Sequence, residues 1–116
     1  MGNTRQVIIP QGMEILYEKF HYCPGIKVGN TLYISGQVGR DENFQIIEGT
    51  EAQFIQAFEN VQKVLSAAGA TFDNVVEMIT YHVTEFSHSS EPEQRKIPYL
   101  PLFMQVKDRY FINQLD

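Results

Sequence analysis

The sequence predicts an α+β fold in which two helices pack on one side of a mixed β-sheet. Three observations support this: a hairpin pattern at residues 21–37, an amphipathic helical pattern at 51–68, and a second helical pattern after Pro101. The chain has 116 residues, of which 43% are hydrophobic and 20% are charged. Because this length and composition suit one globular unit, residues 1–116 are expected to form a single domain.

A first, short strand is predicted at the apolar run Val7-Ile8-Ile9. Pro10 ends the run, and proline cannot donate a hydrogen bond to a neighbouring strand, so an edge position is expected. Residues 10–20 are interpreted as a connection.

The hairpin is predicted from two strand-like runs, residues 21–28 and 31–37, which flank Gly29-Asn30. Glycine and asparagine tolerate the positive φ angles of a tight two-residue turn. Such a turn fixes the register, so that Val28 pairs with Thr31 and Ile26 pairs with Tyr33.

Continued outward, the same register gathers three polar side chains on one face, Tyr22, Ser35 and Gln37. A bulge at Pro24-Gly25 would shift the pairing by one residue and separate them. Both alternatives are open at this stage.

A long helix is predicted from about Glu51 to Ala68. Thr50 offers an N-cap oxygen, and Gln53 stands where it can reach back to the cap amide. Gly69 suits the left-handed residue that follows a helix. One apolar stripe runs along the helix at three- and four-residue spacing: Phe54, Phe58, Val61, Val64, Leu65 and Ala68.

A further strand is predicted at residues 75–84, which are rich in β-branched and aromatic types. Neither face of this strand is plainly polar, so a partner subunit is expected to cover the second face. Beyond Pro98 and Pro101, a second helix is predicted from Leu102, Phe103, Val106, Tyr110 and Phe111, which recur at helical spacing.

Several classes of protein and site are disfavoured. The net charge of −5 and the lack of a basic run argue against nucleic-acid binding. There is no apolar run long enough for a membrane span and no secretory signal, and Cys23 is the single cysteine, so a reducing cytoplasm is expected. The three histidines His21, His82 and His88 do not have metal-ligand spacing, so neither a metal site nor a cofactor is expected.

Two segments carry a family resemblance. HYCPGIKVGNTLYISGQVG, at residues 21–39, resembles the strand–turn–strand signature of the RidA/YjgF/UK114 family, also called the endoribonuclease L-PSP family. Five residues match that signature in spacing: Tyr22, Gly29, Ser35, Gly36 and Gln37. The stretch QAFENVQKVLSAAGATFDNVVEMITYHV, at residues 56–83, is similar to the helix and strand that follow in the family.

The resemblance implies a chorismate mutase-like fold, a homotrimer, and sites between subunits that deaminate reactive enamines and imines. It places a substrate carboxylate near Tyr22, Ser35, Gly36 and Gln37. The family's arginine and late glutamate have no counterpart before Asp116, so the domain is expected to be C-terminally shortened and no catalytic residue is assigned. The sequence departs from the signature at Phe20-His21 and at Cys23-Pro24-Gly25, which changes the expected pocket wall.

Three functions follow as hypotheses. The first is a cofactor-independent deaminase of small imino acids, with weak or no activity because the carboxylate-binding arginine is missing. The second is a non-catalytic protein that binds a small carboxylate or serves as a scaffold. The third is an endoribonuclease, which an acidic chain without a paired acid and base supports least.

Overall fold

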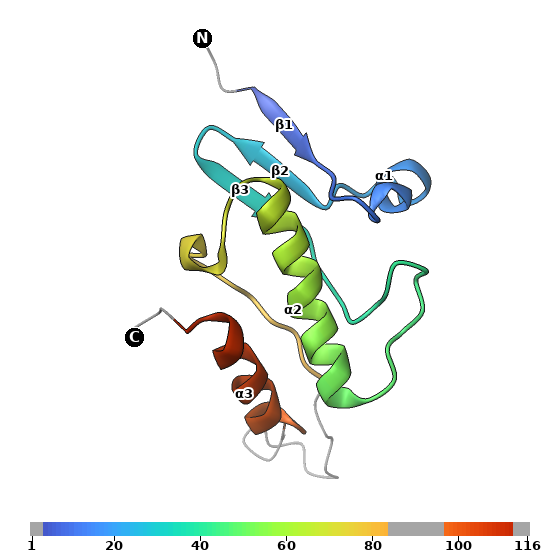
Figure 1. The fold of residues 1–116 in the computed structure, drawn as a ribbon, viewed down its shortest axis with the longest axis vertical. Coiled ribbons are helices and arrows are strands. Elements are labelled where there is room, and N and C mark those ends of the chain that lie inside the picture. The colour runs from blue at the N-terminus through green and yellow to red at the C-terminus, as the bar shows by residue number, and fades with distance from the viewer. Residues whose placement is uncertain (1–3, 84–96, 113–116) are drawn as a thin grey trace, which may run out of the picture.

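The computed structural model describes residues 4–83 and 97–112 of the chain. The elements follow in the order β1 (Arg5–Ile8), α1 (Glu14–Phe20), β2 (Gly25–Val28), β3 (Thr31–Ile34), α2 (Thr50–Ala67), the 3₁₀ helix η1 (Phe72–Asn74) and α3 (Leu100–Tyr110). Within the described residues, the strands form one antiparallel sheet in the order β1-β2-β3. The long helix α2 packs against the sheet, and α3 lies beside α2 (Figure 1). The predicted α+β class is confirmed.

The register of the hairpin is also confirmed. Val28 pairs with Thr31 and Ile26 pairs with Tyr33 across the Gly29-Asn30 turn. The pairing continues beyond the strands without a bulge, because the Ser35 amide donates to the Pro24 carbonyl oxygen at 3.0 Å.

The N-terminal part agrees with the prediction for the first strand and differs from it over residues 10–20. Among the described strands, β1 pairs only with β2, so it is an edge strand as predicted. The interpretation of residues 10–20 as a plain connection was wrong, because α1 occupies Glu14–Phe20. The helix is stabilised where the Glu14 carboxylate accepts a bond from the Gly12 amide at 2.9 Å, and where Leu16 packs on the core. Two turns are too short to display a helical period in the sequence.

The long helix begins one residue earlier than predicted and is capped differently. Thr50 is its first residue, while Gly49 occupies the N-cap position and provides no side-chain bond, so the predicted Thr50 cap was wrong. Gly69 has a φ of 78° after the last turn, as predicted.

Two faces of α2 are buried. Val64 is fully buried against the sheet in a cluster with Ile8 and Met13. Another face packs against α3 and η1 through an aromatic cluster in which Phe58 stacks on Tyr110 with ring centroids 5.0 Å apart. The helical pattern predicted after Pro101 therefore corresponds to α3, and its apolar side chains pack on α2 as the spacing indicated.

The strand predicted at residues 75–84 is not formed over the described part, residues 75–83. This segment runs as an extended chain near α2 (Figure 1), and none of the described strands pairs with it. Its β-branched composition favours an extended backbone, but a strand also needs a neighbour that shares hydrogen bonds. Val76 is 99% exposed and Tyr81 is 92% exposed, whereas the His82 ring packs edge-on against Phe103 at 4.6 Å.

Candidate functional site

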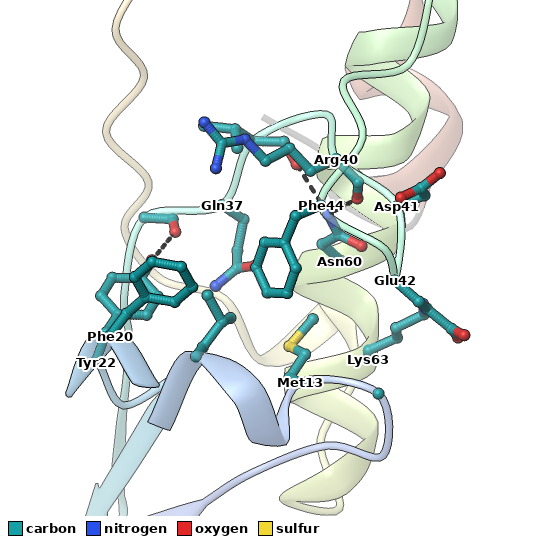
Figure 2. Close-up of a pocket in the computed structure, with 14 residues that line it drawn as sticks. Met13, Phe20, Tyr22, Gln37, Arg40, Asp41, Glu42, Phe44, Asn60 and Lys63 are labelled. Carbon is teal, nitrogen blue, oxygen red and sulfur yellow. Dashed lines mark hydrogen bonds and ion pairs between the residues drawn. The ribbon is translucent and has the colours of Figure 1, made fainter. Parts of the chain in front are cut away.

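A pocket of about 360 Å³ lies between α1, the loop after β3, and α2 (Figure 2). One part of its wall is apolar and aromatic, formed by Met13, Leu16, Phe20, Tyr22 and Phe44. The remainder is mainly polar or charged, formed by Gln37, Arg40, Asp41, Glu42, Asn60 and Lys63. The volume is at the lower end of the roughly 300–1,000 Å³ typical of small-molecule sites.

The structure brings three of the four predicted binding residues to this pocket. Tyr22, Gly36 and Gln37 line it, and the Tyr22 hydroxyl donates to the Gly36 carbonyl oxygen. Ser35 does not line the pocket, because its hydroxyl donates to the Pro24 carbonyl oxygen at 3.1 Å. The Gln37 side-chain amide donates to the Ser35 carbonyl oxygen at 3.3 Å, which orients it within the loop. The binding roles of all four residues stay predictions.

The end of α1 aims Tyr22 into the pocket. His21 has a φ of 53°, a left-handed conformation that ends the helix, and the Tyr22 amide donates to the Leu16 carbonyl oxygen at 3.0 Å. A histidine gives little sequence signal for such a turn, since glycine is the usual residue in that conformation. The placement of Tyr22 was predicted from the hairpin register, but this turn was not.

Asn60 attaches the pocket loop to α2, and the sequence analysis did not identify it. It is the buried polar residue of the described core, with 7% exposure. Its side-chain amide nitrogen donates to the carbonyl oxygens of Val38 at 2.8 Å and Arg40 at 3.0 Å, while its oxygen accepts from Gln56 at 2.9 Å. One sequence signal was available: Asn60 lies four positions before Val64, so both side chains are on the same, inward-facing side of α2, where a polar residue is unusual.

Gly39 allows the same loop to approach α2 closely. A Cβ at this position would lie 2.6 Å from the Gln53 backbone oxygen, which is too short for any side chain. Asn60 and Gly39 together therefore fix the loop that carries the polar wall of the pocket.

Beyond Gly39 the loop turns around Asp41. One Asp41 carboxylate oxygen accepts bonds from the amides of Asn43 and Gln45, each at 2.9 Å. This turn holds Phe44 at a φ of 63° and places its ring 5.7 Å from the Phe20 ring.

The charged groups of the pocket differ in what they contact. Lys63 pairs with Glu42 at 3.6 Å, and Asp41 is engaged by backbone amides. Arg40 is exposed, and its side chain makes no ion pair or hydrogen bond with another described residue. Its guanidinium is therefore available to an anionic ligand, and planar carboxylates match its paired donors.

Two further side chains with chemical potential, the Cys23 thiol and the Arg109 guanidinium, lie outside the pocket lining. Cys23 is half-buried, and its thiol donates to the Gly25 carbonyl oxygen at 3.0 Å. Arg109, on α3, pairs with Glu51 at 3.1 Å as an exposed group. Within residues 4–83 and 97–112, no three His, Cys, Asp or Glu side chains are grouped to hold a metal ion. None of the helices in those ranges is long and apolar enough to cross a bilayer.

Comparison with known proteins places the chain in a family. The profile of the family described as endoribonuclease L-PSP matches residues 15–96. The RutC family protein YjgH of Escherichia coli is 35% identical over 78 residues, covering 67% of this chain and 60% of YjgH. A solved structure of the protein YJGH superposes with a TM-score of 0.76 at 30% identity, covering 96% of this chain and 77% of that one.

A mouse protein named 2-iminobutanoate/2-iminopropanoate deaminase is 43% identical over 60 residues, covering 48% of this chain and 43% of the mouse protein. The chain thus spans less than two thirds of the length of both curated relatives. The profile nevertheless covers most of the chain, and the fold agrees with that of YJGH. The chain belongs to the endoribonuclease L-PSP family, the RidA/YjgF family whose strand–turn–strand signature it carries.

Proposed function

We propose that the protein binds the carboxylate of small reactive imino acids in the Tyr22 pocket and hydrolyses their imine or enamine group. The observation that carries this proposal is the convergence of Tyr22, Gly36 and Gln37 on one pocket. It is supported by membership of a family that includes proteins named as 2-iminobutanoate/2-iminopropanoate deaminases. The Arg40 guanidinium, which forms no ion pair among the described residues, favours an anionic ligand at the pocket.

The reaction needs little from the protein beyond positioning. Water adds to the imine carbon and forms a C–O bond, the nitrogen takes up protons, and the C–N bond then breaks to release ammonia and a keto acid. Because imines of this kind hydrolyse in water unaided, holding the substrate beside an oriented water is the main contribution expected. The Gln37 amide and the Tyr22 hydroxyl line the pocket and are neutral hydrogen-bonding groups, so we assign them the role of holding this water.

The proposed assembly is a homotrimer in the cytoplasm. Its support is residues 75–83, where the apolar side chains of Val76, Ile79, Tyr81 and Val83 are largely exposed in the single chain. A contiguous run of this kind is typical of a protein interface. A partner subunit that covers it would also complete sites at the subunit boundary.

A second candidate is binding without catalysis, and one observation favours it. Both carboxylates of the pocket are engaged, Asp41 by two backbone amides and Glu42 by Lys63. Both carboxylates therefore already hold the loop in place, and no other described carboxylate lines the pocket to act as a general base. The ribonuclease hypothesis has less support, because the net charge is −5 and neither His21 nor His82, the histidines in the described part of the chain, lines the pocket.

The deciding experiment measures 2-iminopropionate hydrolysis, with the imine generated in situ from alanine by an amino-acid oxidase. Faster loss of the imine with the protein than without it is expected, and Gln37→Leu should slow it. Gln62→Ala, an exposed change on α2, is the matched control and should leave the rate unchanged. The contrary outcome is a trimer by light scattering that binds pyruvate but does not speed up imine hydrolysis. That result would refute catalysis and favour the binding protein.

A further inference from the structure

The pocket has more aromatic wall than a three-carbon acid requires. Phe20, Tyr22 and Phe44 contribute rings to a cavity of about 360 Å³, which Met13 and Leu16 extend with further apolar surface. A ligand as small as pyruvate would leave most of this wall in contact with water. Apolar burial is proportional to area, so a larger apolar side chain would gain affinity from the same pocket.

Phe44 is held in a conformation that bulky residues rarely adopt. Its φ of 63° lies in the left-handed region, which is sterically costly for a side chain of this size. The conformation is maintained by the Asp41 turn, and the ring meets that of Phe20 at 5.7 Å with an interplanar angle of 51°. Strained backbone of this kind concentrates at functional sites, which makes Phe44 a candidate ligand contact.

The charged wall provides a complementary anchor. Lys63 is neutralised by Glu42, whereas the Arg40 guanidinium has no acidic partner among the described residues. In Figure 2, Arg40 lies above Gln37, while Phe20 and Phe44 lie on the aromatic side of the pocket. One pocket therefore offers a cation and a pair of aromatic rings to the same ligand.

We propose that this pocket selects α-imino and α-keto acids with a bulky apolar side chain, above all an aromatic one. Phe20 and Phe44 contact the ring of the ligand, and Arg40 binds its carboxylate. The inference rests on the proposed function, since it names the substrate class of the same site.

The expected discrimination can be stated as a ratio of dissociation constants. A single additional methylene in an apolar pocket is worth roughly 10–200-fold in discrimination, and an aromatic ring adds more apolar area than a methylene. Phenylpyruvate, a stable keto-acid analogue, should therefore bind at least about tenfold more tightly than pyruvate.

Isothermal titration calorimetry of the full chain with phenylpyruvate and pyruvate tests this ratio. Phe20→Ala and Phe44→Gly should each reduce it mainly by weakening phenylpyruvate; glycine accepts the positive φ of residue 44, so this variant removes the ring without backbone strain. Arg40→Gln should weaken both acids by a similar factor. Tyr17→Ala, an exposed aromatic outside the pocket lining, is the control and should change neither affinity.

The outcomes separate the two proposals. If neither acid binds, the proposed carboxylate-binding function is refuted, and the proposed substrate class is refuted as well. If pyruvate binds as tightly as phenylpyruvate, or if both phenylalanine variants keep the original ratio, only the preference for a bulky side chain is overturned. If Arg40→Gln leaves both affinities unchanged, the proposed carboxylate anchor is wrong.

Discussion

Two segments without regular secondary structure flank α2, and they differ in how the single chain holds them. Residues 35–49 form a loop whose carbonyl oxygens are bound by Asn60 and whose turn is closed by Asp41. Residues 75–83 are extended, and Val76, Ile79, Tyr81 and Val83 expose most of their apolar side chains. The first is held by directional polar bonds to α2, whereas the second contacts the described chain mainly through Val75, which packs on the core, and the His82 ring, which meets Phe103.

The difference separates what the chain can specify alone from what needs a further surface. Buried polar bonds are directional, so they define one path for the pocket loop. The hydrophobic effect has no such directionality, and the exposed apolar side chains of residues 75–83 stabilise a structure only when another surface removes them from water. The loop should therefore respond to substitutions on α2, whereas residues 75–83 should respond to the state of assembly.

The largest effect is expected from Asn60→Leu, which keeps the side-chain size but removes the donor and the acceptor. The carbonyl oxygens of Val38 and Arg40 would each lose a part-buried hydrogen bond, and at about 0.5–1.5 kcal/mol for each bond the unfolding free energy should fall by about 1–3 kcal/mol. Urea denaturation measures the loss, with the exposed Gln62→Ala as the control on the same helix. An unfolding free energy within error of the parent would show that the loop does not depend on this residue.

A loss of comparable size is expected from Gly39→Ala. The added methyl would lie 2.6 Å from the Gln53 backbone oxygen, so the loop must move away from α2, and overpacking of this kind costs about 1–3 kcal/mol. Gly36→Ala is the matched control, because a Cβ there would meet nothing within 4 Å. Equal stability of the two variants would contradict the close contact between loop and helix.

The sequence predicted the parts of the fold that are governed by local patterns. The Gly29-Asn30 turn fixed the hairpin register, and the apolar stripe located α2 to within one residue at each end. The strand at 75–84 was wrong over its described part because β propensity indicates an extended backbone but cannot supply a pairing neighbour. The short α1 was missed because seven residues carry too little periodicity.

The candidate site was predicted only where it coincides with the hairpin. Tyr22, Ser35 and Gln37 were placed together by register and Gly36 was added by the family resemblance, but the Ser35 hydroxyl turns to Pro24 and the other three line the pocket. Arg40 and Phe44 enter the pocket on a loop that Asn60 holds from α2, and the path of this loop depends on contacts 14 to 22 residues apart along the chain. No local pattern in the sequence specifies contacts of that range, so these residues became visible only in three dimensions.

A smaller effect on the single chain is expected from the double variant Val76→Thr and Tyr81→Ser. Both side chains are almost fully exposed, so the unfolding free energy of the monomer should change by no more than about 0.5 kcal/mol. The proposed oligomer should dissociate at higher protein concentration than the parent, as measured by light scattering over a dilution series. Tyr17→Ser is the control for loss of an exposed aromatic ring. Unchanged assembly would show that residues 75–83 do not form the interface.

The smallest effect is expected at Tyr110, in the aromatic contact between α2 and α3 that belongs to neither segment. Burial raises the pKa of the Tyr110 hydroxyl above its ordinary value of 10.0, and the negative charge of Glu59 adds to the rise, although Arg109 opposes it. The folded protein therefore holds this proton more firmly than the unfolded chain. The resulting stability is fully present below pH 10.0 and is lost as the pH rises from there through the folded pKa.

Tyr110→Phe should remove that part of the alkaline loss while changing stability little at neutral pH. The bond from the hydroxyl to the Ile55 carbonyl oxygen is long, at 3.5 Å, its contact with Glu59 is part of the raised pKa, and phenylalanine preserves the ring that stacks on Phe58. Urea midpoints of the parent and the variant, compared from neutral pH to above pH 10, isolate this contribution because the other tyrosines and the lysines titrate in both proteins. Parallel curves would show that Tyr110 ionises equally in the folded and unfolded chain, and a steeper loss in the variant would reverse the assigned direction of its pKa.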